Sequence, residues 1–460
     1  MLQNRFLRLY VGLAAAMLAH GVWAGESAPP GKRPNVLVLL SDDQRFDTIG
    51  ALGNPEVQTP NLDRLVARGY VFRNNFVMGS TQPAVCLPSR AMLQSGRSLW
   101  RVPGNLSAVP TWGETMRRAG YAAFGTGKWH NGVESYARSF SQGGPIFFGG
   151  MCDHLSVPAF DFDPSGKYPA KDRRVFTKFS SELFADAAVN FLHHYRAAEP
   201  FFLYVAFTAP HDPRMAPEEY ARLYDPAKIT LPRNFMPQHP FDNGELQIRD
   251  ELLAPFPRTP EIVREHIAAY YAMITHLDAQ IGRVLAALEE TGHADDTVVV
   301  FSSDNGLAVG QHGLLGKQNL YEHSVRMPLL FAGPGIPKGE SPALVYLHDL
   351  FPTVCELAGL PAPRDIDGRS LAPIWRAEQK LVRDHVLLAY RDAQRAIRES
   401  RWKLIRYRVG GVTTTQLFDL DHDPWELDNR ADDPALASER NRLELLLDRT
   451  RREFGDPAEF

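Results

Sequence analysis

Acidic and amide side chains follow two apolar stretches of the sequence. Asp42 and Asp43 come almost directly after the stretch NVLVLL. Asp304 and Asn305 follow the stretch TVVVF in the same way. An all-oxygen ligand set favours a hard divalent cation, Ca²⁺ or Mg²⁺, over zinc, which prefers histidine or cysteine. Either pair alone would be consistent with turn chemistry, but the two together predict a metal site.

Basic and imidazole side chains follow two further apolar stretches. Lys128 and His130 lie just beyond YAAF, and His211 lies beyond FFLYVAF. Lys317 lies a short way after the Asp304 turn. Such side chains can move protons and hold an anionic oxygen, so we expect them at the same site. The alternative is that each histidine is packed in the core and that the lysine is solvated.

Cys86 lies in the segment AVCLPSRAMLQSGR, two residues before Pro88 and four before Arg90. Proline suits the first turn of a helix, which places Cys86 at a helix amino end, where free N–H groups and the dipole favour negative charge. We therefore expect a thiol with a lowered pKa, which suggests a nucleophile, although a buried structural cysteine is the alternative. A soft thiolate is nevertheless a weak ligand for a hard cation. An oxygen nucleophile would fit the metal site better.

The elements that position these residues alternate along the chain. Apolar runs at 35–40, 121–124, 201–207 and 297–301 indicate strands buried on both faces of a parallel sheet. Helical patterns lie between them, notably at 261–292. Ligands bind beyond the carboxyl ends of such strands, where the reactive residues fall. The pattern predicts an α/β fold with a large, mostly parallel central sheet flanked by helices.

Beyond about residue 380 the pattern changes to that of a smaller C-terminal α+β domain. Residues 402–420 alternate as a hairpin around Gly410 and Gly411, and residues 440–454 form a final helical pattern. We expect a signal peptide at 1–24, a catalytic domain at 33–378 and a C-terminal subdomain at 379–460. The stretch 135–176 is rich in glycine, proline and aromatic residues and is expected to be a long irregular loop near the site.

Composition and the first residues limit the possible partners and the location. The net charge is only −4, without long runs of either sign, which argues against a nucleic-acid partner. Arg5 and Arg8 precede a short apolar stretch that ends in a small-residue cleavage site near Ala24. We expect export to the periplasm or beyond without stable membrane insertion. Three cysteines in an oxidising compartment leave at least one unpaired.

The sequence Cys86-Leu87-Pro88-Ser89-Arg90, completed by MLQSGR, resembles the signature of the type I sulfatases of the alkaline phosphatase superfamily. The segments NVLVLLSDD, TGKWH, APHDP, SSDNG and HGLLGK also resemble sulfatase segments in the expected order. The resemblance implies an alkaline-phosphatase-like fold. It also implies that a formylglycine-generating enzyme oxidises Cys86 to Cα-formylglycine before folding, which supplies an oxygen nucleophile.

The same resemblance implies a role for each matching residue. Asp42, Asp43, Asp304 and Asn305, with residue 86, would hold the metal, usually Ca²⁺ in this family.

Arg90 and Lys128 would stabilise the aldehyde hydrate, and Lys317 and His211 would face the sulfate ester. One hydroxyl of the hydrate attacks sulfur, and His211 or Lys317 protonates the leaving alcohol. His130 then deprotonates the second hydroxyl, which expels sulfate and restores the aldehyde.

Several functions remain open from the sequence. The overall sequence pattern is similar to that of bacterial polysaccharide sulfatases, which implies a sulfated carbohydrate substrate. A phosphonate monoester or phosphodiester hydrolase of the same superfamily, or a choline-sulfatase-like enzyme, is the alternative. A binding protein without turnover and a cysteine-nucleophile hydrolase are further alternatives. Cys152, Asp153 and His154 either shape a sugar subsite or belong to a loop that packs on the core.

Overall fold

The central element of the computed structural model, which describes residues 33–460, is a nine-stranded sheet. Its strands run in the order β10-β2-β11-β9-β1-β8-β4-β5, with β12 beside β2. The strands of this sheet are β1 (Asn35–Ser41), β2 (Tyr70–Phe76), β4 (Ala122–Lys128), β5 (Gln142–Phe147), β8 (Phe201–Ala206), β9 (Thr297–Ser303), β10 (Arg326–Met327), β11 (Leu329–Ala332) and β12 (Gly339–Tyr346).

Five strand pairs of this sheet are parallel, and the three that join β2 to β10, β2 to β11 and β9 to β11 are antiparallel. The prediction of a large, mostly parallel sheet is therefore confirmed. The four strands predicted from apolar runs, β1, β4, β8 and β9, lie next to one another in the parallel part. Their carboxyl ends consequently meet at one edge of the sheet.

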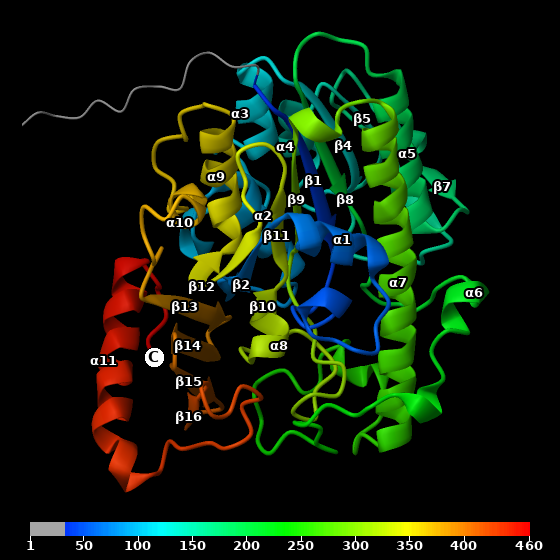
Figure 1. The fold of residues 1–460 in the computed structure, drawn as a ribbon. Helices are drawn as coiled ribbons and strands as arrows, with labels where there is room; N and C mark the ends of the chain where they lie inside the picture. The colour runs from blue at the N-terminus through cyan, green and yellow to red at the C-terminus, as the bar shows by residue number, and fades with distance from the viewer. Residues whose placement is uncertain (1–32) are drawn as a thin grey trace, which may run out of the picture. The chain divides into compact units, whose positions relative to one another are not determined.

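Helices cover both faces of the sheet (Figure 1). The helices are α1 (Pro60–Arg68), α2 (Cys86–Ser95), α3 (Trp112–Arg118), α4 (Val133–Ser139), α5 (Ser180–His194), α6 (Glu218–Ala221), α7 (Pro260–Glu290), α8 (Glu322–Val325), α9 (Leu350–Leu357), α10 (Ala372–Trp375) and α11 (Ala437–Glu453). Helices α5 and α7 lie on one side of the strands and α2, α3 and α9 on the other.

Strand β1 shows why the strand sequences are continuously apolar. Val36, Val38 and Leu40 belong to the core on the side of α3 and α9, whereas Leu37 and Leu39 belong to the core on the side of α5 and α7. All five side chains are almost completely buried. Because successive side chains of a strand point to opposite faces, a strand covered on both faces needs apolar residues at every position.

The long helix α7 begins where local chemistry favours a start. The Thr259 side chain accepts a hydrogen bond from the backbone N–H of Ile262, and Pro260 occupies the first helical position. Both features satisfy or remove N–H groups that a helix start leaves without partners. The helix was predicted over nearly the same residues.

A second, five-stranded sheet lies near the C-terminus. Its order is β16-β15-β14-β13-β3, and its strands are β3 (Gly79–Ser80), β13 (His385–Tyr390), β14 (Gln394–Glu399), β15 (Trp402–Val409) and β16 (Val412–Asp419). The predicted hairpin is the pair β15 and β16, and α11 makes contacts with β13, β14 and β15. Residues Pro34–Phe460 form one compact unit, and the division near residue 378 stays a prediction.

The buried side chain of Lys403 connects the second sheet to the loop that carries several candidate site residues. Its Nζ lies 3.1 Å from Glu322 of α8 and 2.7 Å from Glu426. Breaking a buried pair of this kind by removing one partner costs about 3–5 kcal/mol. The C-terminal sheet therefore holds the segment between β9 and α8 in place.

The region 135–176 is not the irregular loop that was expected. It contains α4 and β5, and residues β6 (Val157–Ala159) and β7 (Arg174–Phe176) pair as a small antiparallel sheet. Aromatic packing explains this order, because Tyr136 and Tyr168 pack edge to face. Glycine and proline therefore shape turns between short elements here.

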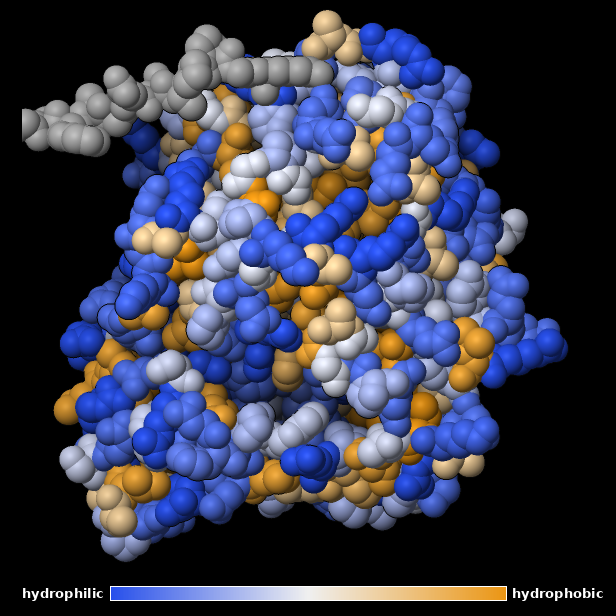
Figure 2. Space-filling model, in the orientation of Figure 1, coloured by the Kyte–Doolittle hydropathy of each residue, from blue (hydrophilic) through white to orange (hydrophobic). Residues whose placement is uncertain are grey.

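Within residues 33–460 no helix is long and apolar enough to cross a membrane. Figure 2 shows that polar residues cover most of the visible face, with hydrophobic residues in separate groups between them. The predicted signal peptide at 1–24 lies outside the described residues.

Candidate active site

Three carboxylates and one amide meet beyond the ends of β1 and β9. Asp43 accepts a hydrogen bond from the side chain of Asn305 at 2.7 Å, and Asp304 accepts one from the backbone N–H of Asp43 at 3.1 Å. Asp42 belongs to the same group, since its carboxylate, the Cys86 thiol and the Asp304 carboxylate offer ligand atoms within 4.8 Å of one another. All four side chains are at most 1 % exposed. The structure thus brings together the four predicted metal ligands.

The donor atoms of this group fit a hard divalent cation. Asp42 Oδ1 and Asn305 Oδ1 are buried and have no hydrogen-bond partner among the described residues. A buried oxygen acceptor without a partner costs free energy, which a cation bound there would recover. Burial and the nearby Asp304 carboxylate raise the pKa of Asp42 to about 7, against the opposing effect of Lys128 and Arg90. We infer that Asp42, Asp43, Asp304 and Asn305 would hold the ion.

Cys86 is the first residue of α2, as the sequence predicts, and is 3 % exposed. The expected low thiol pKa is wrong, because burial raises the pKa of Cys86 more than Lys128 and Lys317 lower it. A protonated, buried thiol is a poor nucleophile. In a modified protein its Sγ would be replaced by the oxygen of Cα-formylglycine, so contacts of Sγ stand for contacts of that oxygen.

Arg90 lies one helical turn after Cys86 and is completely buried. Its Nε donates to Asp304 Oδ2 at 2.9 Å, its Nη2 lies 3.4 Å from Asp42 Oδ2, and its Nη1 donates to the carbonyl of Lys128 at 2.7 Å. The guanidinium therefore fastens α2 to the ends of β1, β4 and β9. This arrangement places residue 86 against the cluster of the four predicted metal ligands.

Two buried lysines lie beside the carboxylates. Lys128 Nζ lies 2.5 Å from Asp42 Oδ2, and Lys317 Nζ lies 2.6 Å from Asp43 Oδ1. Burial alone would lower both lysine pKa values, but the neighbouring carboxylates outweigh it and raise them. Both amines are therefore cationic at neutral pH. A cation bound by the carboxylates would compete for Asp42 and Asp43 and leave the amines able to face an anion.

The two predicted histidines lie on either side of residue 86. His130 Nδ1 lies 3.4 Å from Cys86 Sγ, and His211 Nε2 lies 3.7 Å from Asp43 Oδ2. Burial, followed by the charges of Lys128 and Arg90, lowers the pKa of His130 to about 2. Burial and Lys317 lower the pKa of His211 well below its usual value. Both imidazoles are therefore neutral in this form of the site.

The backbone at the ends of these strands adopts an unusual conformation that helps to bring the site residues together. Asp43 has a φ of 69° and His130 a φ of 70°, in the left-handed region that such residues rarely adopt. Gly127 has a φ of 92°, and a Cβ there would come within 1.8 Å of the Ala206 carbonyl oxygen. The glycine before Lys128 is therefore needed for β4 to approach β8 closely. Backbone strain of this kind is typical of functional sites.

A cavity of about 270 Å³ opens above residue 86. It is lined by Pro83, Ala84, Cys86, His130, Gly150, Met151, His211, Ile248, Arg249, Asp250, Lys317 and Gln318. The sequence reasoning missed the contribution of residues 248–250, because the segment between β8 and α7 has no periodic pattern. In the sequence, the only sign of a role for Arg249 and Asp250 is that two opposite charges stand next to each other.

The three residues whose role was left open lie in different surroundings. His154 is buried, and its ring contacts the carbonyl of His211 at 2.9 Å and Ser180 Oγ at 2.6 Å. Cys152 packs against the core beside α5 and α7, and Asp153 is exposed. His154 therefore supports the His211 loop from behind and does not line the cavity.

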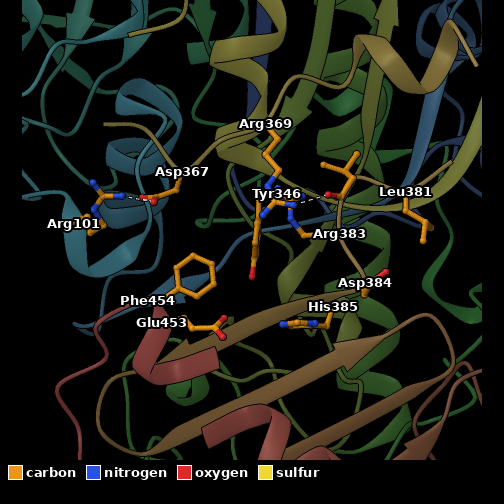
Figure 3. Close-up of a pocket in the computed structure, with 11 residues that line it drawn as sticks. Arg101, Tyr346, Asp367, Arg369, Leu381, Arg383, Asp384, His385, Glu453 and Phe454 are labelled. Atoms are coloured by element: carbon orange, nitrogen blue, oxygen red, sulfur yellow. Dashed lines mark hydrogen bonds and ion pairs between the residues drawn. The ribbon is translucent and has the colours of Figure 1, made fainter. Parts of the chain in front are cut away.

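A second, larger cavity of about 600 Å³ lies between the catalytic body and the start of the C-terminal sheet (Figure 3). Arg101, Tyr346, Asp367, Arg369, His385 and Phe454 are among the side chains around this hollow. Arg101 is paired with Asp367, and Arg383 forms two bonds with Asp349. None of the residues predicted to act in catalysis or metal binding lines it.

Comparisons with known proteins agree with the motifs. The family model described as Sulfatase matches residues 34–360, and the model described as N-sulphoglucosamine sulphohydrolase, C-terminal, matches residues 310–453. A choline-sulfatase of Rhizobium meliloti (strain 1021) is 29 % identical over 87 % of this chain and 83 % of its own length. An N-acetylglucosamine-6-O-sulfatase of Bacteroides thetaiotaomicron is 26 % identical over 97 % of this chain and 91 % of its own length.

Solved structures share the fold. One, of a protein in complex with its substrate D-glucosamine-2-N,6-O-disulfate, has a TM-score of 0.78 and 24 % identity, covering 93 % of this chain and 99 % of that chain. A phosphonate monoester hydrolase of Agrobacterium radiobacter has a TM-score of 0.70 and 23 % identity, covering 92 % and 96 %. The alkaline-phosphatase-like architecture expected from the motifs is thus common to all of them.

Proposed function

The chain belongs to the sulfatase family and is a sulfuric ester hydrolase, and we propose that it releases sulfate from a sulfated carbohydrate at the site around residue 86. The observation that carries this proposal is the convergence, at one edge of the sheet, of Cys86, Arg90, the four predicted metal ligands, two lysines and two histidines, all buried except the half-buried His130. Ten predicted residues from six separate segments meet there.

Two groups would complete the site. Cα-formylglycine at position 86, made by a formylglycine-generating enzyme before folding, would supply the oxygen nucleophile, and a divalent cation would neutralise charge beside it. The raised pKa of the Cys86 thiol supports the modification, because the unmodified residue is a weak nucleophile. The all-oxygen ligand set supports Ca²⁺, with Mg²⁺ as the alternative.

The buried cations would stabilise the charge on the sulfuryl oxygens. Lys317 lines the cavity above residue 86, and Lys128 is held at its base beside Asp42. Positive charge fixed in a buried site interacts strongly with charge that develops during reaction. Arg90 orients residue 86 and Asp304 through the helix rather than lining the cavity.

The two histidines are placed for opposite proton transfers. His211 lines the cavity next to Lys317, and we propose that one of these two protonates the leaving alcohol oxygen; Lys317 already carries a proton, whereas the neutral His211 would first have to gain one. His130 Nδ1 faces the side-chain atom of residue 86 at 3.4 Å and would remove a proton from the oxygen that replaces Sγ. General acid and base roles of this kind require a group within hydrogen-bond reach of the proton.

The names of similar sulfatases support a sulfated carbohydrate as the substrate. The N-acetylglucosamine-6-O-sulfatase matches nearly the whole chain. The choline-sulfatase relative keeps the small-molecule alternative open, but among residues 33–460 no phenylalanine, tyrosine or tryptophan lines the cavity to bind a quaternary ammonium group. A phosphonate hydrolase fits less well, since the family model that matches the chain is that of the sulfatases.

We propose that the protein acts after export, in the periplasm or outside the cell. The charged start, apolar stretch and cleavage site of residues 1–24 support export. The absence of a membrane-spanning helix among residues 33–460 is consistent with this location.

The proposal is tested by measuring sulfate release with ion chromatography. Protein co-produced with a formylglycine-generating enzyme is offered sulfated monosaccharides, choline sulfate and a phosphonate monoester, each with Ca²⁺ present. We expect kcat/KM for a sulfated sugar to exceed that for the other two classes by at least about 10-fold, since only differential transition-state binding discriminates substrates. The Cys86→Ala variant is the control. Faster turnover of the phosphonate would contradict the proposal.

A further inference from the structure

Arg249 lies at the mouth of the active-site cavity with its hydrogen-bond donors already engaged. Its Nη1 donates to Asp212 Oδ2 at 2.6 Å, and its Nη2 donates to Asp212 Oδ1 at 2.9 Å. Nε and Nη2 both donate to Asp250 Oδ1, at 3.0 and 2.6 Å. The remaining contact of Nη1 is with Met151 Sδ at 2.8 Å, and a thioether is a weak acceptor. Only this position is open to a better acceptor.

The charges at the mouth are unequal. Two carboxylates flank one guanidinium, so Arg249, Asp212 and Asp250 together carry one net negative charge, with Lys317 on the inner side of Asp250. Burial works against the ionised form of Asp250, but Lys317, the hydrogen bond from Gln318 and Arg249 together outweigh it and hold the pKa of that carboxyl at about 2. The side chains of Asp212 and Asp250 are 9 % and 10 % exposed, so solvent screens them little.

A second anionic group on the substrate would therefore meet repulsion at the mouth. Lys317, the lysine that lines the cavity, belongs to the pocket for the sulfate being removed. Among the residues that line the cavity, Arg249 is the only further cation, and carboxylates already occupy two hydrogen-bonding edges of its guanidinium. Like charges without a compensating partner cost binding free energy.

Neutral hydroxyls suit the same place. One hydroxyl can accept from Nη1 of Arg249 more strongly than Met151 Sδ does, and a second hydroxyl can donate to a free lone pair of Asp250 on the opposite edge of the guanidinium. Asp250 is held for this by Gln318, whose Nε2 donates to Asp250 Oδ2 at 2.8 Å. Ile248 and Ala84 add apolar surface for the face of a sugar ring.

We propose that Arg249 and Asp250 recognise ring hydroxyls of the substrate, so that the enzyme selects sugars whose only charged group is the sulfate to be removed over sugars that carry a second sulfate or a carboxylate. This inference rests on the proposed function of the same cavity and names its substrate class more narrowly. Both residues act on specificity and neither takes part in the chemical step.

Binding to protein that retains Cys86 tests the selection without any turnover. The chain is produced without the formylglycine-generating enzyme and titrated calorimetrically, with Ca²⁺ present. The probes are inorganic sulfate, galactose 6-sulfate, N-acetylglucosamine 6-sulfate and the disulfated counterpart of each sugar. We expect at least one monosulfated sugar to bind about 5-fold or more tightly than both inorganic sulfate and its disulfated counterpart. Equal or tighter binding of the disulfated sugars, or no gain over inorganic sulfate, would overturn the proposal.

The Asp250→Asn variant locates the effect. We expect it to weaken binding of the monosulfated sugar about 3- to 10-fold and to bring the two sugar classes to similar affinity, while inorganic sulfate binds at least as tightly as before because Lys317 loses a neighbouring carboxylate. Asp242→Asn makes the same change of charge on the same segment outside the cavity and should leave all affinities as they were. An Asp250→Asn protein with unchanged discrimination would refute the assignment. Failure of the proposed function would appear separately, as absence of sulfate release by the modified enzyme.

Discussion

The cavity above residue 86 and the larger cavity beside the C-terminal sheet both contain arginine and aspartate but differ in how their charges are used. The larger, peripheral one contains arginine–aspartate pairs that remain partly exposed, such as Arg101 and Asp367 at 42 % and 19 %. The smaller one lies above the Arg90–Asp304 pair, which is completely buried. Burial makes the charges of the smaller cavity strong and their pKa values unusual. Convergence of buried charge therefore identifies the active site better than volume does.

The largest contrast should come from removing residue 86. The Cys86→Ala variant has no side chain that can become the nucleophile, so kcat should fall by at least about 1,000-fold. The matched control is Cys355→Ala, because Cys355 is also a buried cysteine but lies in α9, outside both cavities. Sulfate release measures both variants. An active Cys86→Ala enzyme would show that the nucleophile lies elsewhere.

The next contrast compares two arginine–aspartate pairs directly. Asp304→Asn should lower activity at least about 100-fold and reduce bound metal, because it removes a charged ligand from a buried site. Asp367→Asn should leave activity within about 2-fold and cost about 1 kcal/mol of stability, as is typical of a partly exposed pair. Metal content is measured by inductively coupled plasma mass spectrometry. Equal losses in both variants would remove the distinction between the cavities.

Metal removal should affect stability as well as activity. Chelation leaves Asp42, Asp43 and Asp304 buried close together without a neutralising ion. At a Ca²⁺ concentration about 100 times Kd, binding should add about 2.7 kcal/mol to the free energy of unfolding. Thermal unfolding with and without Ca²⁺ measures this, and the Asp304→Asn variant should show a smaller response. An unchanged midpoint on chelation would argue against the metal site.

The smallest expected effect belongs to the peripheral cavity. Burial lowers the pKa of His385 in the folded protein. As the pH decreases through about 6.5, the unfolded chain therefore binds a proton more readily than the folded chain, and the free energy of unfolding decreases. His385→Gln should reduce this loss between pH 7.5 and pH 5 by less than about 1 kcal/mol, since the side chain is only half-buried. Urea unfolding at both pH values tests this. A large change in activity at pH 7.5 would give the second cavity a functional role.

Much of the site could be predicted because its residues follow strands whose sequences are distinctive. Asp42, Lys128, His211 and Asp304 come after apolar runs that must be strands, and parallel strands bring their ends together. The antiparallel part of the large sheet could not be predicted in this way. Its strands β10 and β11 are too short to show a pattern.

The parts that the sequence could not predict depend on long-range contacts. The thiol pKa of Cys86 was expected to be low from its helix position alone, but burial under the surrounding loops outweighs the local effect. Arg249 and Asp250 reach the cavity through a segment without periodicity. Their role became visible only from their contacts with Asp212 and Gln318.

The central claim, that residue 86 is a modified nucleophile, is tested most directly by mass spectrometry of the tryptic peptide of residues 74–90 from active enzyme. Conversion of the thiol to an aldehyde lowers the peptide mass by about 18 Da, and the account predicts that specific activity rises in proportion to this species. An enzyme that releases sulfate while its peptide carries only the unmodified thiol would contradict the account.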